Sequence, residues 1–149
     1  MAKFKFQLAT LMRLREATRD ERRAALAEAY QAQQKLRERL AEKQEELFAL
    51  RGSYSQAAAP GRVEVDRLLY TQRYELVLRS ELKMLEDQSL LITTEVEKRR
   101  LTLVEADREL RVLEKLRDKQ HERFQYAEQC KEMKQLDEVA AGRQAREVC

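Results

Sequence analysis

The sequence predicts an all-α protein in which two long helices form an antiparallel coiled-coil hairpin, the second helix being longer and overhanging the first. Three observations lead to this prediction: few glycines and prolines, a composition of 38% charged and 6% aromatic residues, and apolar residues at seven-residue intervals. Such compositions are typical of long helices and coiled coils. Since aromatic material is scarce, we expect a single elongated domain, residues 1–149, with an apolar seam instead of a thick core.

Helix-breaking residues occur at four positions, and three of them lie together: Gly52, Pro60 and Gly61. Inside a helix, proline costs roughly 3 kcal/mol and glycine about 1 kcal/mol. The cluster therefore predicts the turn of the hairpin, and the fourth breaker, Gly142, predicts the end of the second helix. The predicted segments are a first helix at about 3–57, a turn at about 58–62, a second helix at about 63–141 and a frayed tail at 142–149.

Heptad spacing predicts which face of each helix is buried. In the first helix, two lines begin at Leu26 and Ala29, as the a and d positions of a coiled coil do. In the second helix, the best seam runs from Leu82 to Leu113. The seam positions are Leu26, Gln33, Leu40, Leu47 and Tyr54 with Ala29, Leu36, Lys43 and Leu50 in the first helix, and Leu82, Ser89, Val96, Leu103 and Leu110 with Leu85, Ile92, Arg99, Ala106 and Leu113 in the second.

The off-centre turn predicts an overhang. A loop this short excludes parallel helices, and the second helix is some twenty residues longer than the first. We expect the overhang to begin near Asp118 and to end near Leu136. The predicted antiparallel neighbours are Leu11 with Leu110, Leu26 with Val96, and Leu40 with Leu82.

The residues that catalytic and metal sites need are missing. A single histidine, His121, excludes a site with paired histidine ligands, and we expect it on a solvated surface. The phosphate-loop, dinucleotide-turn, nucleophile-elbow and zinc-helix motifs are absent. Cys130 and Cys149 lack CxxC spacing and are expected to be thiols. The sequence therefore predicts no enzyme activity, no metal and no cofactor.

The charge pattern argues against nucleic acid. The net charge of +3 arises from 30 basic and 27 acidic residues spread along the chain, so no global field results. The basic run from Arg13 to Arg23 is interrupted by Glu16, Asp20 and Glu21, which would repel phosphates. A DNA-binding helix stays the alternative to a charged face that contacts an acidic protein. No apolar run approaches the roughly 20 residues of a membrane span, and the first residues lack a signal peptide's apolar block, so we expect a cytoplasmic protein without direct membrane insertion.

Apolar and tyrosine residues exceed what one seam can bury. Tyr54, Tyr70 and Tyr74 gather at the hairpin end, where they either cap the splaying helices or form a docking patch. Further along, leucines lie off the seam and must face a partner or solvent. A second copy of the chain is one such partner, in a four-helix dimer. The leucines in question are Leu90, Leu91 and Leu101.

Both ends of the chain resemble those of a known family. Residues 4–16, FKFQLATLMRLRE, resemble an opening pattern F-x-L-x-x-L-L-x-x-R-E, and residues 131–140, KEMKQLDEVA, resemble an ending K-E-x-K-x-L-D-E-x-A. These are patterns of the FliJ family of flagellar export proteins, which is related to the stalk proteins of type III injectisomes. The length and the mid-chain break are similar as well, so the resemblance covers essentially the whole chain.

The resemblance implies a cytoplasmic coiled coil, similar to the gamma stalk of rotary ATPases, that acts in flagellum biogenesis and motility. Its implied partners are the hexameric flagellar export ATPase, the cytoplasmic domain of the membrane export gate, and empty export chaperones. Through them it would be peripheral at the inner membrane. The alternatives are the equivalent injectisome stalk and a self-associating scaffold. The implied ATPase-ring contacts are Arg13, Arg15, Glu132, Lys134, Leu136, Asp137 and Glu138, and the implied gate-docking residues are Leu47, Leu50, Tyr54, Tyr74 and Leu78.

Overall fold

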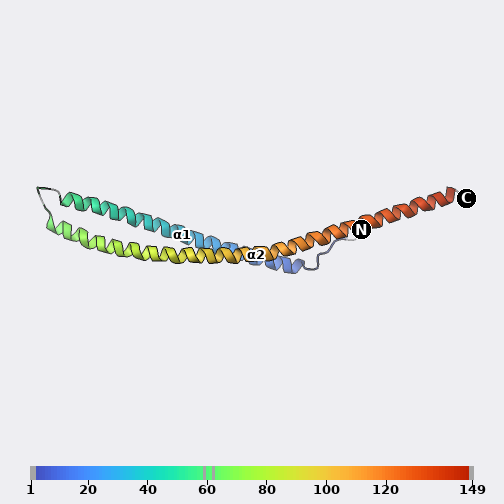
Figure 1. Cartoon of the computed structure of the whole chain (residues 1–149), viewed down its shortest axis with the longest axis horizontal. Helices are drawn as coiled ribbons and strands as arrows, with labels where there is room; N and C mark the ends of the chain where they lie inside the picture. The colour runs from blue at the N-terminus through green and yellow to red at the C-terminus, as the bar shows by residue number, and fades with distance from the viewer. Residues whose placement is uncertain (1–2, 59, 62, 148–149) are drawn as a thin grey trace. The chain divides into compact units, whose positions relative to one another are not determined.

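In the computed structural model the chain forms two α-helices, α1 (Ala9–Ala57) and α2 (Val65–Glu147), joined by a short turn (Figure 1). The structure describes residues 3–58, 60–61 and 63–147, and of residues 144–147 the backbone alone. The helices contain 49 and 83 residues, and the described residues form no strand. The predicted fold class, a hairpin of two helices with the second one longer, is confirmed.

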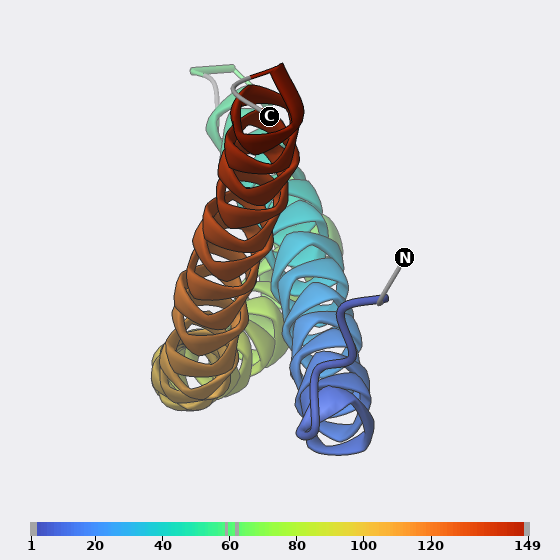
Figure 2. The same ribbon diagram turned by 90° about the vertical axis from the view of Figure 1, so that its right-hand side faces the viewer.

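The first helix begins at Ala9, six residues after the predicted start at residue 3. The preceding residues form the amino strap, Lys3–Leu8, which ends in a turn closed by the Ala9 amide and the Phe6 carbonyl at 3.3 Å. Figure 2 shows this strap as a plain tube ahead of the first helical turn. The strap is not helical because its phenylalanines are packed: Phe6 is only 8% exposed, and the Phe4 ring lies beside Phe124 of α2. Local helix propensity cannot take account of such long-range packing.

The turn follows Ala57, and α2 begins at Val65, two residues later than predicted. Gly61 has a φ of 118°, in the region that favours glycine, and Pro60 precedes it without an amide hydrogen to continue a helix. Gly52 lies inside α1, so Pro60 and Gly61 are the breakers that act. In the first turn of α2, Asp66 complements the positive end of the helix dipole.

The second helix does not end at Gly142. It continues to Glu147, so the tail that the sequence predicts to fray is helical as far as the structure describes it, and residues 148–149 lie outside the description. One glycine costs about 1 kcal/mol, which the flanking alanines and charged helix formers can offset.

The contacts divide the chain into two compact units. Unit 1 combines Met1–Asp20 with Val104–Cys149, and unit 2 is the hairpin from Glu21 to Leu103. In unit 2, α1 and α2 lie side by side and run in opposite directions, as the cyan and yellow-green ribbons of Figure 1 show.

The predicted seam is confirmed in unit 2. Ala29, Leu82 and Val96 are buried, and the other seam positions of this unit are half-buried. The polar positions are accommodated by bonds across the seam. Arg99 Nη1 donates to the Ala25 carbonyl at 2.6 Å, and the Lys43 ammonium lies 3.1 Å from the Glu81 carboxylate. These contacts lie within three residues of the predicted neighbours Leu26 with Val96 and Leu40 with Leu82.

In unit 1 the amino end of the chain packs along α2. Leu110 is 1% exposed and Ala106 is buried, as the seam predicts. Arg15 Nη1 forms an ion pair with Glu109 at 2.6 Å. This antiparallel contact lies close to the predicted pair of Leu11 and Leu110.

The strap moves the start of the overhang. The Phe4 ring lies 5.0 Å from the His121 ring and 5.7 Å from that of Phe124, so α2 is covered beyond Asp118, where the overhang was expected to begin. A fully extended chain can advance about 3.3 Å per residue and a helix only 1.5 Å, so the non-helical residues Lys3–Phe6 can reach further along α2 than the predicted helical start would. Figure 1 shows it passing the first turn of α1 beside the orange part of α2.

Candidate functional surfaces

The five residues implied for gate docking lie near the turn that joins α1 to α2, a region that we call the bend. Their side chains differ in exposure. Leu47, Leu50, Tyr54 and Tyr74 are half-buried. Leu78 is 1% exposed, so its side chain packs in the seam between the helices. Any role of Leu78 in docking would be indirect. Heptad phase could have shown this, because Leu78 precedes the seam residue Leu85 by seven positions.

Tyr74 is held by a polar network that crosses from α2 to α1. Its hydroxyl donates a hydrogen bond to Glu46, and the Lys43 ammonium lies 3.0 Å from the same carboxylate. The hydrogen bond from Tyr74, followed by that from Lys43, lowers the pKa of Glu46 below its ordinary value. Hydrogen bonds to Glu46 and Glu81 raise the pKa of Lys43. The network fixes the orientation of the Tyr74 ring.

The most exposed apolar side chains near the bend are different ones. Tyr70 is 69% exposed, and its ring stacks on that of Tyr74 with centroids 6.2 Å apart and an angle of 12° between the planes. Four further exposed apolar residues lie near the bend and off the heptad seam, and the implied docking set omits them as it omits Tyr70. We name these residues, together with Tyr54 and Tyr74, the bend surface. The omitted residues are Phe48, Leu69, Tyr70, Leu76 and Val77.

At the amino end, the two implied arginines have different surroundings. Arg13 is exposed, whereas Arg15 is half-buried and bound to Glu109. A partner could meet the Arg13 guanidinium directly. It would compete with Glu109 for Arg15.

The implied residues near the end of α2 lie in the carboxyl segment, Lys131–Arg143, in which every side chain is exposed. The segment stays helical although no apolar side chain in it is covered by described residues. Leu136 is 69% exposed, Met133 63% and Val139 57%. The charged residues implied for the ring contact surround them: Glu132, Lys134, Asp137 and Glu138.

Apolar residues of this region recur at helical spacing. Tyr126, Cys130, Met133 and Leu136 follow one another at intervals of four, three and three residues, which places them on one side of α2. Tyr126 is 70% exposed and Cys130 half-buried. The second cysteine, Cys149, lies outside the described residues. This arrangement gives the region an apolar side, of which Tyr126, Met133 and Leu136 are exposed.

His121 is exposed, as expected, but its ring is not merely solvated. It contacts Phe4, and its Nε2 lies 3.0 Å from the side-chain nitrogen of Gln125. Within the described part of the chain, no cluster of His, Cys, Asp or Glu side chains could hold a metal ion. The described helices also include no stretch long and apolar enough to cross a membrane.

The architecture places the chain in the class of antiparallel coiled-coil hairpins whose exposed helical surfaces suit protein binding. A family model described as "Flagellar FliJ protein" matches residues 4–148. The chain therefore belongs to the FliJ family and is a component of flagellar type III protein export. No curated protein and no solved structure matches it.

Proposed function

We propose that the chain is a non-enzymatic stalk and adaptor of the export apparatus. The end of α2 inserts into the ring of the export ATPase, and the bend surface binds the cytoplasmic domain of the membrane export gate. The observation that carries the proposal is the carboxyl segment, a helix whose side chains are all exposed. Escort of empty chaperones and a position at the cytoplasmic face of the inner membrane belong to the same proposal and rest on family membership.

The carboxyl segment suits a protein ring because all its side chains are exposed, with apolar groups on one side of the helix and charged groups on the others. Met133 and Leu136 supply apolar side chains, and Lys134 and Glu138 supply opposite charges. A surrounding ring could contact all of them at once. Arg13 adds a cation from the amino end, and Arg15 is a weaker candidate because it is already paired with Glu109.

Adding the purified chain to the cognate export ATPase tests the ring contact. We expect higher ATPase activity or more ring assembly. Leu136→Ala should weaken the stimulation about fivefold or more, because burying a leucine side chain contributes about 1.5 to 3 kcal/mol. Leu90→Ala is the matched control, since Leu90 is 70% exposed and Leu136 69%. The proposal fails if bound chain changes neither activity nor assembly.

The bend surface suits docking because it combines rigid aromatic rings with exposed aliphatic side chains. The stacked rings of Tyr70 and Tyr74 are fixed by the bond from Tyr74 to Glu46, so little side-chain entropy would be lost on binding. Tyr54 and the half-buried Leu47 and Leu50 extend the surface onto α1.

Substitution of two tyrosines with nearly equal exposure tests whether the bend surface and the end of α2 bind different partners. Tyr70→Ala should weaken binding to the cytoplasmic domain of the gate at least about fivefold and leave ATPase stimulation intact. Tyr126→Ala should weaken ATPase stimulation and leave gate binding intact, and Tyr126 is 70% exposed against 69% for Tyr70. Binding is measured by titration calorimetry. If both variants bind the gate as the native chain does, the bend surface is not the docking site.

A further inference from the structure

The side of α2 that is turned away from α1 carries two rows of exposed apolar residues. If Leu82 is position a of the seam's heptad, these rows occupy positions b and c, and position f lies between them, opposite the seam. We call the three rows together the outer face of α2. Position b is occupied by Leu69, Leu76, Lys83 and Leu90, position c by Tyr70, Val77, Met84 and Leu91, and position f by Arg73, Ser80 and Asp87.

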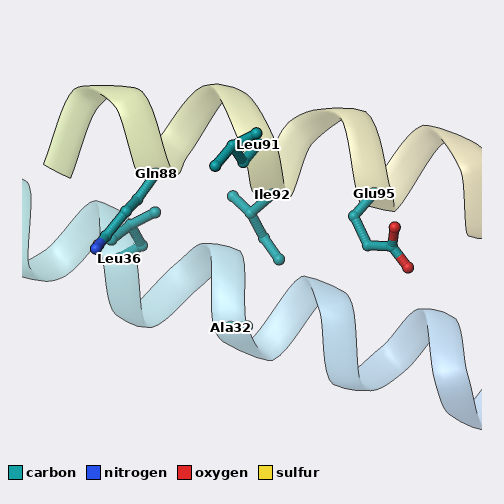
Figure 3. A pocket seen from close by; sticks show the side chains of 6 residues that line it. All are labelled: Ala32, Leu36, Gln88, Leu91, Ile92 and Glu95. Atoms are coloured by element: carbon teal, nitrogen blue, oxygen red, sulfur yellow. The ribbon is translucent and has the colours of Figure 1, made fainter. Parts of the chain in front are cut away.

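The apolar residues of the outer face are not used by the hairpin itself. In Figure 3 the side chain of the seam residue Ile92 reaches into the space between α1 and α2, whereas that of its neighbour Leu91 lies beside the α2 ribbon. All apolar members of the two rows are exposed, Leu91 to 73%. From Leu69 to Leu91 the helix rises about 33 Å. Exposed apolar surface of this extent marks a protein interaction site.

The outer face is complementary to its own reverse. A two-fold axis at right angles to α2, passing between two copies at Ser80, brings together residues at equal distances before and after Ser80. Such an axis keeps each row on its own side, so row b meets row b and row c meets row c. Apolar residues then oppose one another, except that Lys83 can lay its aliphatic stem on Leu76. The opposed residues are Leu69 with Leu90, Leu76 with Lys83, Tyr70 with Leu91, and Val77 with Met84.

The f row adds opposite charges at matching distances. Arg73 and Asp87 each lie seven residues from Ser80, so the same axis brings Arg73 of each copy to Asp87 of the other. Both side chains are exposed, and the ion pairs among the described residues include neither of them. Parallel copies would instead set arginine on arginine and aspartate on aspartate. The charges therefore favour an antiparallel second copy.

We propose that the outer face of α2 is the interface of an antiparallel dimer, in which the two copies of α2 pack along each other about a two-fold axis at Ser80. The apolar rows supply the affinity, because packing removes them from water. The two pairs of Arg73 with Asp87 select the direction and the register. The small side chain of Ser80 lets the helices approach at the axis.

The dimer would cover part of the bend surface, since Leu69, Tyr70, Leu76 and Val77 belong to both. A chain bound to a second copy could then not dock at the gate through these residues. This consequence rests on the proposed function, whereas the association itself does not.

Sedimentation of the full chain tests the association without any other partner. We expect a mass that approaches twice 17.7 kDa as the concentration rises to hundreds of micromolar. Leu90→Glu should raise the dissociation constant at least about tenfold, because it places carboxylates in the apolar interface. Leu136→Glu is the matched control and should leave it unchanged, since Leu136 is 69% exposed against 70% for Leu90 but lies outside the outer face. A native chain that stays monomeric, or equal effects of the two variants, would overturn the proposal.

Exchange of the charges tests the direction of the dimer. Arg73→Asp sets acid on acid and Asp87→Arg sets base on base, so each variant alone should dimerise at least about fivefold more weakly. The double variant, and an equimolar mixture of the two single variants, should associate as strongly as the native chain. Single variants that dimerise normally, or a double variant and a mixture as weak as the single variants, would overturn the antiparallel arrangement. Circular dichroism verifies that every variant is folded.

Discussion

Two stretches of the same helix, Leu78–Val96 and the carboxyl segment Lys131–Arg143, have opposite surroundings. The first has Leu78, Leu82 and Val96 buried against α1, whereas every side chain of the second is exposed. Burial secures the first, since most helical stability in proteins comes from packing of an apolar face. The second relies on helix propensity and on local ion pairs such as that of Lys131 with Glu128 at 2.8 Å. One part of α2 thus stabilises the fold, whereas another leaves all its side chains exposed.

The largest expected effect is the loss of stability when a side chain of the buried stretch is shortened. Leu78→Ala should lower the free energy of unfolding by about 2 to 5 kcal/mol, because it removes a fully buried side chain. Leu136→Ala in the carboxyl segment should change it by less than about 0.5 kcal/mol. Urea denaturation followed by circular dichroism measures both. Similar losses would mean that the carboxyl segment is packed in solution.

Two glycines provide a smaller test of the same contrast. Gly52 and Gly142 both lie in helices, and an added Cβ would meet no atom within 4 Å at either. Replacement by alanine should stabilise the local helix by about 1 kcal/mol at each. Gly52→Ala should raise the unfolding midpoint of the hairpin. Gly142→Ala should only slow amide exchange near the end of α2, and a raised midpoint would contradict the comparison.

The smallest effect is a pH dependence in the paired region. Because the pKa of Glu46 is lowered in the folded state from 4.5, its contribution to stability is present above pH 4.5 and is lost as pH falls through the folded value. The stability difference between the native chain and Glu46→Gln should therefore shrink on acidification. Glu132→Gln, at an exposed residue of the carboxyl segment, is the control and should change the free energy of unfolding by less than about 0.5 kcal/mol. A Glu46→Gln difference that is constant down to pH 2 would show that the network does not stabilise the hairpin.

The sequence predicted the fold and the seam well, because both follow from periodicity and from two effective breakers. Nearly every heptad position from Leu26 to Leu113 is buried or half-buried, including polar ones such as Gln33 and Arg99. The helix ends were less predictable. Gly52 and Gly142 are tolerated inside helices, since the cost of one glycine is small beside that of proline.

The candidate surfaces were predictable by region but not residue by residue. The apolar surplus near the bend indicated a surface, yet Leu78 belongs to the seam and Tyr70 is the exposed ring. The overhang was expected too early, because the strap depends on contacts of Phe4 with His121 and Phe124, which lie more than a hundred residues away along the chain. Such long-range packing leaves no local periodic signal.

Because Lys3–Phe6 is not helical, the length of the amino end has a different effect on α2 than the length of a helix would have. Removing one residue from a helix turns all residues beyond it by about 100° and disrupts the heptad phase. Removing one residue from the strap leaves the seam in phase and withdraws the cover from α2 by up to about 3.3 Å, the rise of about two helical residues. A few residues at the amino end therefore adjust how much of α2 is exposed, while the hairpin stays the same.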